Sequence, residues 1–140
     1  MNIYKYVFNW KYKHFVKKKR SVLMMVEDLQ FKKFKTLQIR EKEREDYTSI
    51  CSRLGDVNER IKSEKEKPTL SADEIKGLDD QKALLERDKE RKELRLKEID
   101  IEIQGTRPTD EYPDGADGIE QQIELLHNLA HTIDIWLKAI

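Results

Sequence analysis

Apolar residues spaced alternately by three and four positions constrain this chain more than any other feature. Tyr47, Ile50, Leu54, Val57 and Ile61 form one such series, the period of a coiled-coil seam rather than of a strand. No proline and only one glycine, Gly55, occur between residues 26 and 65. The sequence therefore predicts a long helix from about residue 26 to residue 66.

The composition favours long helices over a thick globular core. Charged residues make up 40% of the chain and hydrophobic residues 37%, whereas globular domains average about 25% charged residues and 45–50% apolar residues. A helix that buries one narrow stripe can leave many Glu, Lys and Arg side chains in water. Disorder is the alternative that this composition leaves open.

A second helix is predicted to start directly after a short turn. Pro68 disfavours helical geometry at the residue before it, and Ser71 with Glu74 three positions later fits the capping box of a new helix. The second helix should run from about residue 72 to residue 104, and its apolar residues should face the first series. We expect an antiparallel hairpin over residues 26–104 with its turn at 67–71, whose seam comprises Tyr47, Ile50, Leu54, Val57, Ile61, Ile75, Leu78 and Leu85.

Residues 105–118 hold two of the three prolines and three of the five glycines, which indicates an exposed acidic loop. A third helix is predicted over 119–140, because its apolar residues again alternate at intervals of four and three. It should pack on the hairpin or on another copy of the chain. Its expected partner-helix interface comprises Ile119, Ile123, Leu126, Leu129, Ile133, Trp136, Leu137 and Ile140.

The first 25 residues differ from the rest in charge and in aromatic content. Residues 1–26 contain seven basic and no acidic residues, while the remaining 21 basic and 28 acidic residues make the rest of the chain acidic. We expect a flexible basic aromatic arm; a strand and a helix remain alternatives. Its candidate contacts to an anionic membrane surface or to nucleic acid are Tyr4, Phe8, Trp10, Lys11, Tyr12, Lys17, Lys18, Lys19 and Arg20.

Evidence for a metal site is weak. His127 and His131 are four residues apart on the predicted last helix, a spacing that two ligands of one metal can use, but Asn128 stands where the zincin motif requires glutamate. Residues 110–121 resemble a calcium loop at positions 1, 5 and 6, yet Tyr112 and Gln121 replace two required ligands. We therefore expect no metal and no cofactor.

The sequence as a whole predicts an all-α protein that acts through helix–helix contacts, as a coiled-coil interaction or oligomerisation protein. No phosphate-binding, dinucleotide-binding or nucleophile motif occurs, so no enzymatic activity is expected. The alternative function is a peripheral membrane or nucleic-acid binder that uses residues 1–20. Cys51 is the single cysteine, which fits a reducing intracellular compartment, cytoplasmic or nuclear, and no apolar run reaches the length of a membrane span.

Overall fold

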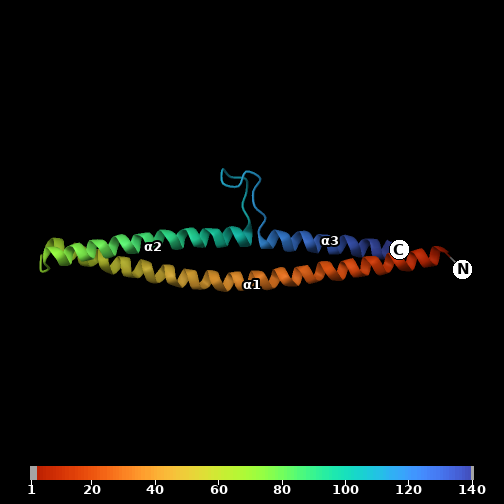
Figure 1. The fold of residues 1–140 in the computed structure, drawn as a ribbon, viewed down its shortest axis with the longest axis horizontal. Coiled ribbons are helices and arrows are strands. Elements are labelled where there is room, and N and C mark those ends of the chain that lie inside the picture. The colour runs from red at the N-terminus through yellow and green to blue at the C-terminus, as the bar shows by residue number, and fades with distance from the viewer. Residues whose placement is uncertain (1–2, 140) are drawn as a thin grey trace. The chain divides into compact units, whose positions relative to one another are not determined.

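The computed structural model describes the backbone of residues 3–139 and the side chains of residues 10–139. Its elements are three helices: α1 (Ile3–Glu66), α2 (Ala72–Gln104) and α3 (Ile119–Ala139). Both α2 and α3 lie along α1 (Figure 1). The predicted all-α architecture, with an antiparallel hairpin and a C-terminal helix, is confirmed.

Helix α1 begins at Ile3 and includes the residues predicted to form a flexible arm. It therefore starts much earlier than the expected residue 26. Residues 1–26 contain neither glycine nor proline, so nothing in the sequence interrupts a helix there. The alternating aromatic residues, which also fit a strand, lie in helical backbone from Ile3 onward.

Apart from Val16, Asp46 and Cys51, which adjoin the series, the buried and half-buried positions of α1 keep one 3–4 spacing from Phe15 to Glu64. We call this series the α1 seam. It comprises Phe15, Lys19, Val22, Val26, Leu29, Lys33, Thr36, Arg40, Glu43, Tyr47, Ile50, Leu54, Val57, Ile61 and Glu64. The apolar series seen in the sequence is thus only the last part of a longer seam, whose middle positions are polar.

The chain divides into two compact units, and α1 contributes to both. The hairpin unit, Leu37–Ile99, pairs the C-terminal part of α1 with α2. Leu54, Val57 and Leu85 form its buried cluster, against which Ile50 and Ile61 pack. Leu78 is also buried.

Side chains on both sides of the hairpin turn satisfy its backbone groups. The Glu64 carboxylate accepts hydrogen bonds from the Thr69 N–H (2.9 Å), the Thr69 hydroxyl (2.6 Å) and the Leu70 N–H (3.1 Å). The Glu74 N–H donates to the Ser71 hydroxyl (3.3 Å), as the capping pattern predicts. The three hydrogen bonds to the Glu64 carboxylate lower its pKa, and the bond from the Thr69 hydroxyl has the largest effect.

The loop unit consists of the residues up to Thr36 and those from Asp100 onward. In this unit α3 runs antiparallel to α1: Lys19 forms an ion pair with Asp134 (2.5 Å), and Lys33 forms one with Glu120 (3.2 Å). Val22, Ala130 and Ile133 make the buried cluster between the two helices, and Phe15, Leu126 and Leu137 pack against it.

The loop between α2 and α3 leaves the helices and returns to nearly the same point (Figure 1). Thr106 and Ala116 exchange backbone hydrogen bonds of 2.8 and 3.1 Å at its base. Gly105 and Gly115 have φ angles of 72° and 79°, which favour glycine. Closer to the helices, the backbones of Gly105 and Gly118 lie very near each other. A Cβ on Gly118 would overlap the Gly105 nitrogen and the Ile103 carbonyl oxygen.

Two adjacent lysines of α1 span this junction. Lys32 lies 4.0 Å from Glu102, near the end of α2, and Lys33 lies 3.2 Å from Glu120, at the start of α3. Ile103 and Ile119, on the two sides of the loop, are both almost completely buried. Along α1, the start of α3 therefore follows the end of α2 directly, although 14 residues separate the two helices in sequence.

Replacing Gly118 by alanine should destabilise the protein, because the new Cβ would meet backbone that cannot rotate away. We expect Gly118→Ala to lower the melting temperature measured by circular dichroism. Gly77→Ala is the matched control, since a Cβ there meets nothing within 4 Å and alanine favours a helix by about 0.5–1 kcal/mol. Equal melting temperatures for the two variants would contradict the close packing at the loop base.

Reversing one ion pair should test whether charge helps to align α3 on α1. Lys33→Glu should lower the free energy of unfolding by about 0.2–1 kcal/mol, because Lys33 and Glu120 are partly exposed. The double variant Lys33→Glu/Glu120→Lys should recover most of this loss in urea denaturation. Additive losses in the double variant would show that the two side chains do not interact.

Candidate interaction surfaces

The charged middle of the hairpin is part of the packed seam. The Lys92 ammonium lies between Glu43 and Asp46, at 2.8 and 3.3 Å. The Tyr47 hydroxyl donates a hydrogen bond of 2.9 Å to Glu93. From the composition, Glu, Lys and Arg side chains were expected to lie in water, yet the 3–4 spacing of buried and half-buried positions continues through Arg40 and Glu43. This unbroken spacing is the sequence signal that could have identified the polar group of Glu43, Asp46, Tyr47, Lys92 and Glu93, which we call the polar layer.

The polar layer shifts two pKa values. Hydrogen bonding to Glu93, with a smaller effect from Cys51, raises the pKa of Tyr47 to about 12. The hydrogen bond to Glu43 raises the pKa of Lys92, although desolvation opposes it. Polar groups in a helical seam typically fix register and orientation at some cost in stability.

The structure places the residues of the expected C-terminal interface mostly against α1 of the same chain. Ile119 and Ile133 are buried, Leu126 and Leu137 pack on the Val22 cluster, and Ile123 is half-buried. Leu129 and Trp136 are more exposed and lie beside this seam, while Ile140 lies outside the described residues.

A second 3–4 series follows α1 on the side opposite its seam. Each member precedes a seam residue by two positions, about 200° around the helix, and every one is exposed. We call this series the outward stripe. It comprises Lys13, Lys17, Arg20, Met24, Glu27, Phe31 and Phe34.

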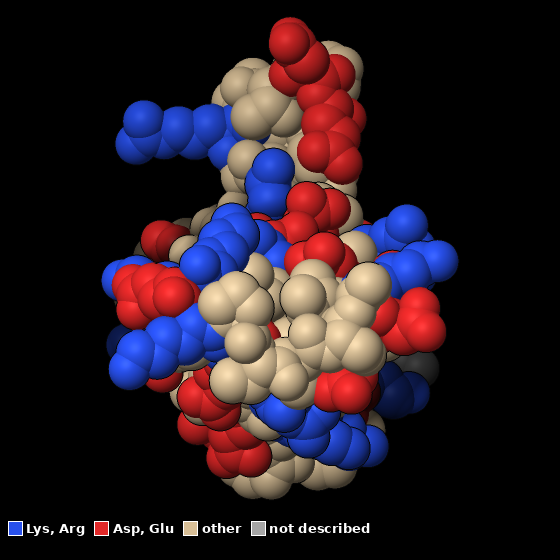
Figure 2. Space-filling view, turned by 90° about the vertical axis from the view of Figure 1, so that its left-hand side faces the viewer, with Lys and Arg blue, Asp and Glu red and all other residues tan. Residues whose placement is uncertain are grey.

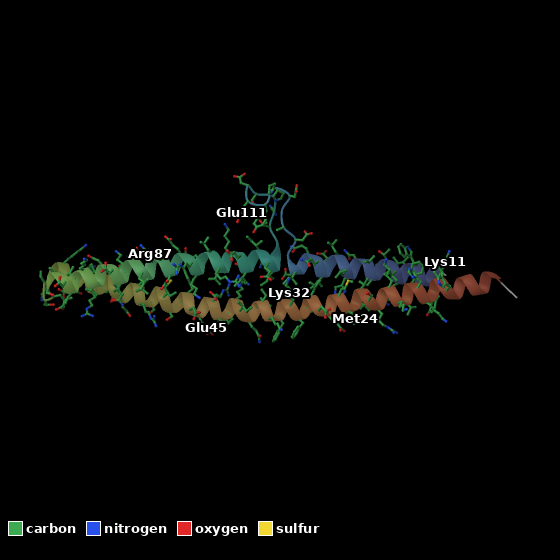
Figure 3. All side chains as sticks on the ribbon, viewed as in Figure 1. Lys11, Met24, Lys32, Glu45, Arg87 and Glu111 are labelled. Atoms are coloured by element: carbon green, nitrogen blue, oxygen red, sulfur yellow. The ribbon has the colours of Figure 1, made fainter. Side chains whose placement is uncertain are left out.

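The C-terminal part of the outward stripe is apolar apart from Glu27, which lies between Met24 and Phe31. Met24, Phe31 and Phe34 are 60%, 59% and 58% exposed. Met24 lies on the side of α1 that faces away from α3 (Figure 3). The Lys35 ammonium lies 4.5 Å from the centre of the Phe31 ring, a cation–π contact that leaves most of the ring in water. The sequence analysis did not predict these three residues as contacts.

The N-terminal part of α1 is basic and aromatic. Of the candidate contacts proposed from sequence, Trp10, Lys11, Tyr12, Lys17, Lys18 and Arg20 are exposed, whereas Lys19 pairs with Asp134. The side chains of Tyr4 and Phe8 lie outside those that the structure describes. Trp10 stacks on His14 with ring centres 5.8 Å apart, and Phe15 contacts Trp136 at 5.5 Å.

The surface at the hairpin turn mixes both signs of charge, unlike the N-terminal part of α1. Figure 2, which looks onto the end of the molecule at the hairpin turn, shows basic and acidic side chains interspersed around a small group of uncharged residues. The first acidic residue of the chain, in contrast, is Glu27. Residues 10–20 therefore present cations without neighbouring acids on the same helix.

The described residues contain no group of three His, Cys, Asp or Glu side chains that could hold a metal ion. His127 and His131 are both exposed on α3. The depressions in the surface are open, and one of them is lined entirely by α1 residues from Trp10 to Arg20. Among the described residues, no helix is long and apolar enough to cross a membrane.

Comparison with protein-family models, with curated proteins and with solved structures found no match.

The raised pKa of Tyr47 predicts a loss of stability at high pH. The folded state holds the phenol proton more tightly than the unfolded chain, whose tyrosine pKa is about 10. The stabilisation should be fully present below pH 10 and should disappear as pH rises toward 12. In urea denaturation at a series of pH values, Tyr47→Phe should flatten this part of the profile, and an unchanged profile would contradict the hydrogen bond to Glu93.

Proposed function

We propose that the protein is a non-enzymatic helix–helix interaction protein of the coiled-coil type, and that the apolar part of the outward stripe receives a helix of a second copy. The observation that carries this proposal is the exposure of Met24, Phe31 and Phe34 on one face of α1. Three large apolar side chains in line on one helix face are typical of a binding surface rather than of a solvated one.

The spacing of the stripe supports a helix as the partner. Met24, Glu27, Phe31 and Phe34 follow the same 3–4 spacing as the α1 seam, which already receives α2 and α3. A helix with a matching series could insert its side chains between them, as in other paired helices. A second copy of this chain is the simplest source of such a helix, since each copy carries the same apolar stripe.

The proposal assigns the protein no catalytic step. The depressions lie on open helix surface, where water would surround any bound molecule, and enzymes generally use enclosed sites. We also propose an intracellular location, cytoplasmic or nuclear, because Cys51 is the only cysteine and is free.

Self-association should depend on the apolar part of the stripe. We expect light scattering to give the full chain a mass of at least two copies, rising with concentration. Phe31→Glu/Phe34→Glu should shift this mass to that of one copy while circular dichroism stays helical, because both side chains are exposed on α1.

The matched control is Leu84→Glu/Leu94→Glu, which removes two equally exposed apolar side chains from α2. Leu84 and Leu94 are the exposed large apolar residues of α2 and lie about 15 Å apart along it, with no third such residue to join them into a patch. The variant should therefore retain the mass of the unmodified chain. A single-copy mass for the unmodified chain at every concentration would overturn the proposed self-association.

A further inference from the structure

The basic part of the outward stripe offers a second surface. Lys13, Lys17 and Arg20 lie on one exposed face of α1 at intervals of four and three. No ion pair among the described side chains involves these three cations, whereas Lys19, Lys32 and Lys33, on or beside the seam, pair with acids of α2 and α3. The acidic residues of the loop unit thus leave the outward cations unneutralised.

Large apolar side chains flank these cations along the same face. Trp10 is 64% exposed and is held by stacking on His14, and Met24 is 60% exposed. Tyr12 is also exposed, but it is two positions from Trp10 and lies on another side of the helix. Trp10 and Met24 therefore lie on either side of the three cations, and the surface around them is open and formed by α1 alone.

We propose that this face of α1 binds the surface of a membrane that contains anionic lipids. Lysine and arginine at these positions can reach lipid phosphates, while Trp10 and Met24 enter the boundary between headgroups and acyl chains. Tryptophan and tyrosine are enriched at this boundary because each combines an apolar ring with a polar group.

The geometry favours a membrane over nucleic acid. Stacking on successive bases needs several rings that line a groove along the strand, whereas Trp10 lies on an open surface formed by α1 alone. The basic face also continues directly into the apolar part of the outward stripe, which matches a lipid boundary better than a phosphate backbone. This inference shares Met24 with the proposed self-association, but it is carried by Lys13, Lys17, Arg20 and Trp10, whereas the self-association is tested at Phe31 and Phe34.

The test is co-sedimentation of the full chain with vesicles of phosphatidylcholine, with and without phosphatidylserine. We expect binding only to the anionic vesicles, weakening as salt is added. Lys13→Gln/Lys17→Gln/Arg20→Gln should lower the partition coefficient by roughly a hundredfold, because three cations near an anionic leaflet are removed. The control Lys62→Gln/Lys65→Gln/Arg87→Gln removes the same charge from exposed positions of the hairpin unit and should lower it much less.

A second readout follows Trp10. Binding to anionic vesicles should shift tryptophan emission to shorter wavelength, and Trp10→Phe should abolish that shift while Trp136→Phe keeps it. Equal effects of the two triple variants would overturn the proposal, as would binding to single-stranded DNA but not to vesicles. Light scattering separates the two proposals, because the Lys13/Lys17/Arg20 variant should keep the mass of the unmodified chain.

Discussion

The regular 3–4 seam of α1 is the constraint on which the other structural features depend. Because side chains at this spacing stay on one side of the helix, a single face of α1 can receive two successive partners. It packs against α2 in the hairpin unit and against α3 in the loop unit. The opposite face receives neither helix, which leaves Met24, Phe31 and Phe34 in water.

Within the loop unit, ion pairs help to align the end of α2 and all of α3 on α1. The described acids of the loop unit include Glu102, Glu120 and Asp134, and each pairs with a lysine of α1. Exposed pairs of this kind contribute little free energy, so burial of Val22, Ala130 and Ile133 accounts for more of the stability. The pairs act instead on register, because a shifted α3 would place its acids away from the lysines.

Much of the fold was predictable from local signals. The apolar spacing predicted α2 and α3, and Pro68 with Ser71 and Glu74 predicted the hairpin turn. The start of α1 was not predictable, since a basic aromatic segment fits a strand, a helix or a disordered arm until its partner is known. That partner is more than 100 residues away in sequence, as Lys19 and Asp134 illustrate.

The candidate surfaces were harder to predict than the helices, for a related reason. Phe31 and Phe34 are apolar, so sequence alone cannot tell whether they face a partner helix or water. Only the burial of Val22, Val26 and Thr36 on one face of α1 shows that the opposite face is exposed. The polar residues of the seam, such as Glu43, were missed because charge usually indicates a solvated position.

Because the base of the loop is closed, the number of residues in the loop has little effect on how α2 and α3 pack. Since Thr106 bonds to Ala116 and the backbones of Gly105 and Gly118 nearly touch, the residues beyond that base span no distance between α2 and α3. The tip could be extended, shortened or exchanged for a folded insert, much as a β-hairpin tolerates a graft. Related chains could then differ freely in the length of this segment. A sequence alignment that penalises long gaps would fail to align α2 and α3 together, although both pack on α1.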